Sequence, residues 1–286
     1  MDMNIQKYMA FIKTVEYGSF TKAAEILNYS QSGISRMIGD LENEWKVTLL
    51  ERGRAGVKLT SDGLKLLPFV KNVCNEYNKL QMQIDGLNGL ESGLIRIGTF
   101  SSVATHWLPN IIKRFQKEYQ NIEYELLLGD YTEIENWILE GRVDFGFLRL
   151  PTNSKLETIF LYRDELMVVL PEKHPLVDKE YFPIKSLCDY PFMLLEKGEK
   201  AEITEIFEKY NMSPNIHFKT LDDYAVMSMV ESGLGISILP KLILQRIPYN
   251  IVTKSLDVEA YRDIGIAYKN KKSLPLAVKK FLEYIC

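Results

Sequence analysis

The sequence predicts an α/β protein in which a small helical head, one long helix and a two-lobed α/β domain follow each other along the chain. Three observations support this prediction. Helical periodicity and one hairpin pattern fill residues 1–60, a heptad-like pattern covers residues 61–89, and strand-like and helix-like segments alternate from residue 94 onward. A chain of 286 residues is long enough for more than one compact domain.

The composition limits the classes of protein to consider. Hydrophobic residues make up 46% of the chain and charged residues 26%, and the net charge is −3, so any nucleic-acid binding has to depend on a local patch. The cysteines at 74, 188 and 286 form no CxxC pair, which predicts a reducing, cytoplasmic location. The N-terminus does not resemble a secretory signal, and no apolar run approaches the roughly 18 residues of a membrane span, so we expect no membrane partner.

Residues 20–42, FTKAAEILNYSQSGISRMIGDLE, have the pattern of two short helices joined by a tight turn. Ser30 is placed to cap the second helix, whose apolar positions 34, 38, 41 and 45 recur at helical spacing. Its opposite stripe is polar, and Gln, Ser and Arg side chains on such a helix can contact base edges or phosphates in the major groove of DNA. Similar helix pairs also occur inside all-helical cores, so the motif alone leaves both interpretations open.

A hairpin of the size of a wing follows in the segment ERGRAGVKLT, with its turn at Ala55 and Gly56. It carries the cations Arg52, Arg54 and Lys58 where DNA phosphates would lie. Residues 1–60 hold eight Lys and Arg against seven Asp and Glu, so the prediction of DNA binding depends on the placement of these cations and not on total charge.

A long helix is predicted from Ser61 to about residue 87. Its apolar seam has the 3-4-3-4-3 spacing of a coiled coil, which predicts a dimer contact. The seam consists of Leu67, Val70, Cys74, Tyr77, Gln81 and Ile84. Pro68 lacks a backbone N–H and is expected to kink the helix or delay its start.

The remaining residues alternate between strand-like and helix-like segments, which predicts parallel sheets with crossover helices. The long run ETIFLYRDELMVVLP and the late run YRDIGIAYK are expected to cross between two lobes. Two lobes joined in this way enclose a central cleft, and ligands of such sheets bind beyond the carboxyl ends of the strands.

The segments FIKTVEYGSFTKAAEILNYSQSGISRMIGDLE and LLERGRAGVKLTSDG resemble the winged helix–turn–helix of LysR-type transcriptional regulators, and the resemblance extends over the whole chain. It implies a DNA-binding domain at 1–60, a linker and dimerisation helix at 61–89, and an effector-binding domain like a periplasmic binding protein at 90–286. Lobe I would comprise about 90–164 and 264–286, and lobe II about 165–263. Gly33 and Leu50 depart from the family, which often has Pro or Ala at the first position and usually an aromatic residue at the second.

The resemblance implies a ligand-responsive regulator whose partners are double-stranded DNA, a small effector and further copies of the chain, as a homodimer and usually a tetramer. Carried over by position, the expected DNA-contacting residues are Thr21, Ser30, Gln31, Ser32, Ser35, Arg36, Arg52 and Arg54.

The expected effector-binding residues are Phe100, Ser101, Ser102, Thr132, Arg149, Lys197 and Thr220. Ser101, Ser102 and Thr132 stand where helices begin and free N–H groups suit an anion. Arg149 ends a strand, and its guanidinium fits a carboxylate, so we expect an anionic effector that bears a carboxylate. The alternatives are helix capping for the Ser and Thr residues, a salt bridge or packing for Arg149, and a solvated loop for Lys197.

The sequence argues against two other classes of protein, an enzyme and an exported solute-binding protein. An enzyme would need a nucleophile with a base or a metal cluster, and His106, His174 and His217 are too far apart to form one, so we expect no catalytic residue, no metal and no cofactor. An exported solute-binding protein would share the two lobes but would carry a leader in place of a winged helix–turn–helix. A gel shift compared with a substrate turnover screen distinguishes the regulator from the enzyme.

Overall fold

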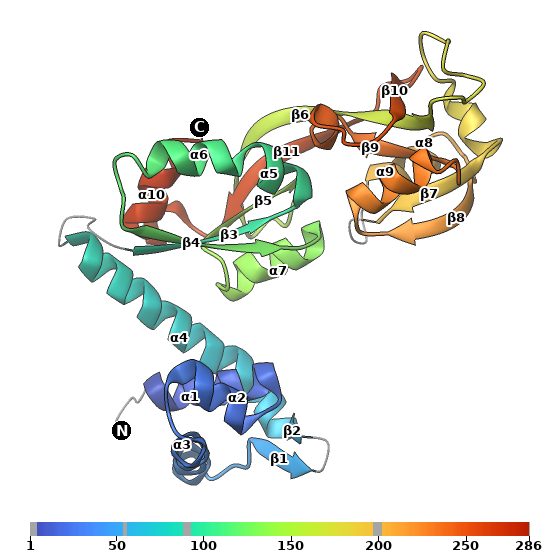
Figure 1. Ribbon diagram of the computed structural model, residues 1–286. Coiled ribbons are helices and arrows are strands. Elements are labelled where there is room, and N and C mark those ends of the chain that lie inside the picture. Colours follow the sequence, from blue (N-terminus) through green and yellow to red (C-terminus); the bar gives the residue numbers. More distant parts are fainter. Residues whose placement is uncertain (1–4, 54–55, 88–92, 197–201, 286) are drawn as a thin grey trace. The chain divides into compact units, whose positions relative to one another are not determined.

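The computed structural model describes residues 5–53, 56–87, 93–196 and 202–285. The chain divides into two compact units, Met1–Leu87 and Asn88–Cys286, and each is described by itself (Figure 1). Within the described residues, no helix is long and apolar enough to cross a membrane.

Unit 1 is a three-helix head with a hairpin, continued by a long helix. Its elements are α1 Ile5–Tyr17, α2 Phe20–Leu27, α3 Gln31–Trp45, β1 Leu50–Gly53, β2 Gly56–Leu59 and α4 Ser61–Leu87. Ser19 and Ser30 cap α2 and α3 by accepting backbone N–H groups, and Asn28 makes the turn between these helices with a φ of 55°. Phe11, Ile34 and Leu41 belong to the buried core that these helices share.

The wing is fastened to α3 by a carboxylate. Oε1 of Glu42 accepts the backbone N–H groups of Leu49 at 2.7 Å and Leu50 at 3.1 Å, directly where β1 begins. Leu50, the residue that departs from the family pattern, is buried and pairs with Leu59 across the hairpin. The position of the wing relative to α3 is therefore fixed by hydrogen bonds as well as by apolar packing.

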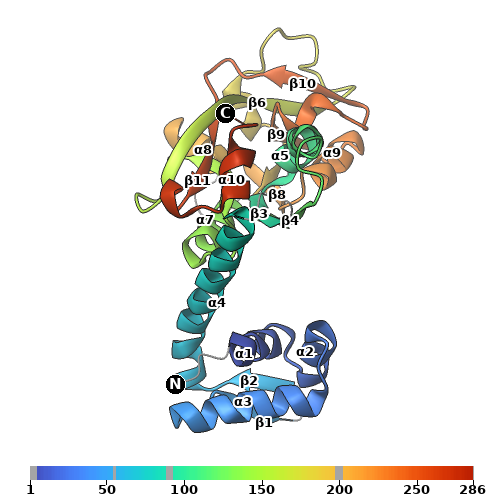
Figure 2. The same cartoon turned by 90° about the vertical axis from the view of Figure 1, so that its left-hand side faces the viewer.

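The helix α4 is continuous through Pro68 (Figure 2), so no interruption accompanies this proline. The predicted seam is wrong in register over its first half, because Val70 and Cys74 are buried within unit 1, where Val70 joins the apolar core of the head. Beyond Leu64, the apolar residues that α4 leaves exposed recur every three or four positions and form a second stripe, called here the linker stripe. It consists of Phe69, Val73, Tyr77, Leu80 and Ile84.

Unit 2 is the α/β part of the chain. Its first half comprises β3 Gly93–Thr99, α5 Ser101–His106, α6 Leu108–Phe115, β4 Ile122–Leu128, α7 Tyr131–Glu140, β5 Phe145–Leu150 and β6 Glu157–Pro171. Its second half comprises η1 Ile184–Cys188, β7 Pro191–Leu195, α8 Glu202–Lys209, β8 Asn215–Thr220, α9 Asp223–Glu231, β9 Ile236–Pro240, η2 Ile243–Gln245, β10 Ile251–Ser255, β11 Tyr261–Tyr268, η3 Lys271–Ser273 and α10 Leu276–Leu282. The helices α5 and α6 are separate, because Pro109 cannot donate a backbone hydrogen bond in the first turn of α6.

The strands of unit 2 follow the order β4-β3-β5-β11-β6-β9-β7-β8, with β10 paired to β6. The pairs β3–β4, β3–β5, β7–β8 and β7–β9 are parallel, whereas β6 and β11 pair antiparallel in the middle. Two hydrophobic cores lie on either side of this crossing: lobe I is built on β3, β4 and β5, and lobe II on β7, β8 and β9. The long strands β6 and β11 thus join the lobes, as the alternation in the sequence predicts.

Candidate functional sites

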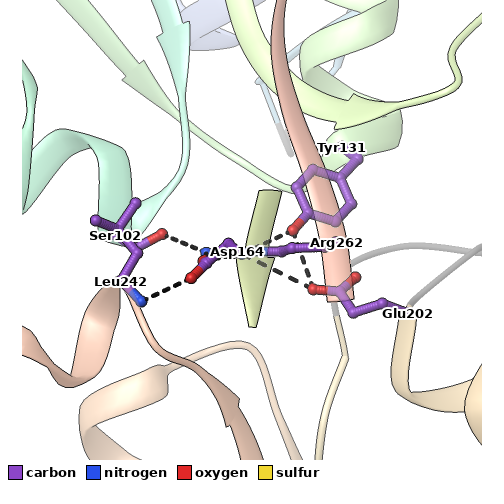
Figure 3. A network of polar contacts seen from close by, with 6 residues as sticks. All are labelled: Ser102, Tyr131, Asp164, Glu202, Leu242 and Arg262. Carbon is purple, nitrogen blue, oxygen red and sulfur yellow. Dashed lines mark hydrogen bonds and ion pairs between the residues drawn. The ribbon is translucent and has the colours of Figure 1, made fainter. Parts of the chain in front are cut away.

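The junction between the lobes is organised around a buried ion pair, Arg262 on β11 and Asp164 on β6 (Figure 3). The two residues are direct cross-strand partners, and both side chains are almost completely buried. Nε and Nη2 of Arg262 donate to Oδ2 of Asp164 at 2.9 and 2.7 Å. Such a pair is tolerated in a protein interior only where further polar groups satisfy both charges.

Lobe I and the segment that follows β9 provide those groups. From lobe I, Oγ of Ser102 accepts from Nη2 of Arg262 at 2.8 Å, and the hydroxyl of Tyr131 accepts from Nη1 at 2.9 Å. The guanidinium carbon lies 5.0 Å from the ring centre of Phe100, within the range of a cation–π contact. Leu242, which follows β9 of lobe II in the chain but packs into the core of lobe I, donates its N–H to Oδ1 of Asp164 at 2.9 Å. The pair is therefore satisfied by lobe I together with the segment that follows β9.

A second carboxylate, Glu202 at the start of α8, approaches the same guanidinium. Its Oε1 accepts from the Tyr131 hydroxyl at 3.2 Å and lies 3.8 Å from Nη1 of Arg262. The Glu202 side chain is only 4% exposed, and within the described residues its Oε2 has no hydrogen-bond partner. Among the described residues, Glu202 is therefore a buried acid with hydrogen-bond partners on one oxygen and none on the other.

Arg149, at the end of β5 in lobe I, binds Glu205 of α8 in lobe II. Nη1 donates to Oε1 at 2.9 Å, and Nη2 donates to Oε2, so the pair is bidentate. The hydrogen bond with Glu205 raises the pKa of Arg149 above its usual value, and the Glu205 side chain is 47% exposed. The salt bridge that was an alternative for Arg149 is therefore present, and it spans the lobes.

Electrostatically, the junction holds more acid than base. Burial by itself lowers the pKa of Arg262, but Tyr131, Asp164 and Glu202 raise it above the usual value, so the guanidinium stays charged. Among the described residues of the junction, two guanidinium groups, of Arg149 and Arg262, face three carboxylates, of Asp164, Glu202 and Glu205.

The structure brings only some of the expected effector residues together. Phe100 and Ser102 meet at Arg262, and Arg149 lies nearby at the contact with α8. Ser101 is the first residue of α5, but this helix has only six residues, so the N-terminal dipole on which the anion hypothesis was based is weak. The Ser102 hydroxyl, expected to donate to an anion, accepts a hydrogen bond from a cation instead.

Thr132 and Thr220 take part in none of the hydrogen bonds that join the described residues of this cluster. Thr132 is exposed in the first turn of α7, which is capped by Asp130 in a capping box with Glu133. Thr220 ends β8, and its hydroxyl accepts the N–H of Asp222 at 3.2 Å. Lys197 lies outside the described residues.

The residues that sequence reasoning missed are Tyr131, Asp164, Glu202, Glu205 and Arg262. A signal for the central pair was available in the alternation of the two long strands. Arg262 is in phase with the buried Ile264 and Ile266, and Asp164 is in phase with the buried Leu166. A charged residue on the buried face of each crossing strand predicts a buried ion pair.

In unit 1, the polar stripe of α3 faces solvent. Gln31, Ser32 and Arg36 are exposed, and Ser35 is half-buried. Oγ of Ser30 accepts the N–H of Gly33 at 3.0 Å, so the first turn of α3 is capped despite the glycine.

The remaining DNA-contact candidates are placed less completely. Thr21 is exposed near the start of α2, and Arg52 belongs to β1. Arg54 lies outside the described residues.

Within the described part of the chain, no group of three or more His, Cys, Asp or Glu side chains is placed to hold a metal ion.

Two family models match the chain, one in each unit. Residues 5–64 match the model described as bacterial regulatory helix-turn-helix protein, lysR family. Residues 88–285 match the LysR substrate binding domain. The chain belongs to the LysR family of transcriptional regulators, a family of regulators and not of enzymes, and its class is that of ligand-responsive, DNA-binding regulators.

Individual relatives and solved structures agree with this assignment. The uncharacterized HTH-type transcriptional regulator YvbU of Bacillus subtilis (strain 168) is 32% identical, over 98% of this chain and 97% of the relative. The probable regulator LrrA of Synechococcus elongatus (strain ATCC 33912 / PCC 7942 / FACHB-805) is also 32% identical, over 93% and 90%. The LysR family regulator CbnR has a similar fold, with a TM-score of 0.75 at 19% identity over 99% of this chain and 98% of that chain. A structure of full-length CbnR with its target DNA has a TM-score of 0.74 at 20% identity, over 99% of each chain.

The buried ion pair yields a stability prediction. Arg262→Met should lower the free energy of unfolding of unit 2 by about 3–5 kcal/mol, because it leaves Asp164 buried without its partner. Hydrogen exchange of the β6 and β11 amides in the full-length protein measures this change. The control is Arg163→Met, which removes an exposed arginine from β6, next to Asp164 in the chain, and should leave exchange unchanged. Equal losses in the two variants would contradict a special role for the buried pair.

Proposed function

We propose that the effector is a small carboxylate-bearing metabolite, that it binds at the junction between the lobes, and that it alters operator binding through the dimer. The observation that carries the proposal is the bidentate contact of Arg149 with Glu205. It supports Arg149 as a seat for a carboxylate, because the planar guanidinium fork matches two carboxylate oxygens. Half of the Glu205 side chain is exposed, so an external carboxylate has access to this contact.

Phe100, Ser101, Ser102, Thr132 and Thr220 are proposed to line the effector site, with Lys197 as a further candidate. In this proposal Ser102 acts indirectly, since its hydroxyl accepts from Arg262 and so helps to orient a second guanidinium. The solved structures do not carry the choice of ligand over to this chain, because the likeness to CbnR supports the fold alone.

Isothermal titration of the full-length protein with a panel of small organic acids tests this proposal. We expect at least one acid to bind, and Arg149→Ala to weaken it by about 1.5–3 kcal/mol, the range for a hydrogen bond to a charged group. Ser102→Ala should weaken it less, because Ser102 acts through Arg262. Binding of a neutral or cationic compound that ignores both substitutions would contradict the anionic effector and leave the regulator assignment intact.

We further propose that α3 contacts base edges and that the wing contacts phosphates, through the eight residues expected from the sequence. Arg36→Ala should weaken specific binding by about 1–3 kcal/mol if its guanidinium contacts a base. Arg54→Ala should weaken all duplexes alike and flatten the salt dependence by about one unit. Fluorescence anisotropy on the DNA upstream of the gene and on a scrambled duplex measures both effects.

The control for the DNA titration is Lys113→Ala, which removes one exposed charge from α6 in unit 2 and should not change affinity. Unchanged operator affinity of the Arg36→Ala protein would contradict α3 as the recognition helix.

The linker helix, residues 61–89 in the proposed division, is proposed to hold the dimer through the linker stripe. Phe69 is 69% exposed and borders an apolar pocket of about 500 Å³ that Tyr8, Trp45 and Val73 also line. An exposed apolar stripe of this length indicates a contact surface, and a second copy of α4 offers the same stripe in return. The resemblance to the family adds the expectation of a tetramer.

Phe69→Glu combined with Leu80→Glu should therefore shift the protein toward monomers in analytical ultracentrifugation and weaken operator binding with it. Asn78→Glu, at a position of α4 that is not three or four residues from any member of the stripe, is the control for added charge and should sediment as the unmodified protein does. Val70→Glu is unsuitable for this purpose, because Val70 is part of the core of unit 1. Unchanged sedimentation of the double variant would place the dimer contact elsewhere, in the lobes.

A further inference from the structure

The helix α8 presents two carboxylates, one helical turn apart, to lobe I. Its residues Ile203, Ile206 and Phe207 are buried in the core of lobe II. On the side toward lobe I, Glu202 accepts a hydrogen bond from Tyr131 and Glu205 binds Arg149. A helix that belongs to one lobe thus contacts the other lobe through two carboxylates.

The contacts of Glu202 and Glu205 are weak compared with the buried ion pair between Arg262 and Asp164. Arg262 and Asp164 are fully buried and share two hydrogen bonds, whereas Glu202 has a buried Oε2 without a partner among the described residues. A buried acceptor without a donor reduces stability, so burial of the Glu202 side chain adds little net stability to the contact between α8 and lobe I. The contact of Glu205 is half exposed and therefore open to exchange with dissolved carboxylates.

We propose that α8 is a built-in competitor of the effector: Glu205, supported by Glu202, occupies the places that effector carboxylates take, and effector binding releases α8 from lobe I. This inference depends on the proposed function, because it concerns the same junction. It also narrows the ligand class. Side chains three residues apart on a helix are neighbours on its surface, so Glu202 and Glu205 present two acids together, and a short aliphatic dicarboxylate carries two acids in one molecule.

The competition has a thermodynamic consequence. A ligand shifts an equilibrium only by its difference in affinity for the two states, and here the effector binds the state in which α8 has left Arg149. Neutralising Glu205 populates that state in advance and should strengthen effector binding. Neutralising an acid of α8 for which the described residues show no contact with an arginine should leave effector affinity unchanged.

The test compares Glu205→Gln with Glu208→Gln in the full-length protein. Glu208 is an exposed residue of α8 and serves as the matched control. Calorimetric titration uses succinate and glutarate as dicarboxylates and propionate as the monocarboxylate. We expect Glu205→Gln to bind a dicarboxylate about fivefold more tightly than the unmodified protein, as for the loss of one partly exposed ion pair. We expect Glu208→Gln to bind within about twofold of the unmodified protein, and propionate to bind more weakly than either dicarboxylate.

A second measurement does not need a ligand. Hydrogen exchange of the α8 amides should accelerate in Glu205→Gln and in Arg149→Gln, and no further in the double variant, because both substitutions remove the same contact. Succinate should accelerate exchange in the unmodified protein as well.

The outcomes separate the two proposals. If an acid binds with dependence on Arg149 while Glu205→Gln changes neither affinity nor exchange, α8 is no competitor and the proposed effector site stands. If no acid binds to either protein, the proposed function is contradicted and the competition with it. Equal affinity for propionate and the dicarboxylates would overturn the ligand class.

Discussion

The ion pair between Arg262 and Asp164 is the constraint on which the rest of unit 2 depends. Removing two charges from water costs several kcal/mol per ion, and this cost is offset only where the remaining donors and acceptors are satisfied. Here Ser102 and Tyr131 of lobe I and the N–H of Leu242, in the segment that follows β9 of lobe II, satisfy them. Because that segment also packs into the core of lobe I, the pair is fully satisfied where the chain leaving lobe II meets lobe I.

The two arginines of the junction have different roles for the same reason. Arg262 is enclosed and bound to Asp164, Ser102 and Tyr131, so it serves the structure. Arg149 lies nearer to solvent and binds a carboxylate from a helix of the opposite lobe. The part of the junction that can rearrange at low cost is therefore the contact of α8.

The sequence predicted those features that depend on local pattern. The caps Ser19 and Ser30, the turn at Asn28 and the alternation of strands and helices in unit 2 each depend on residues close together in the chain. The seam of α4 was predicted in the wrong register, because periodicity shows that a helix has an apolar face but does not show whether its own domain or a partner covers that face. Val70 and Cys74 are buried in unit 1, whereas the linker stripe remains exposed.

The site was less predictable than the fold, because its contacts join distant parts of the chain. The pairing of Arg262 with Asp164 depends on the register of two strands 98 residues apart, and the contact of Glu205 with Arg149 spans 56 residues.

A polar junction between lobes is also more adaptable than an apolar one. Apolar surfaces of two lobes close into a permanent core, whereas carboxylates bound to arginines can be exchanged for other carboxylates of similar spacing. A regulator that responds to a small acid needs this kind of exchange, in which the ligand replaces one satisfied set of hydrogen bonds with another and the free-energy difference between the two states stays small enough for a metabolite to shift.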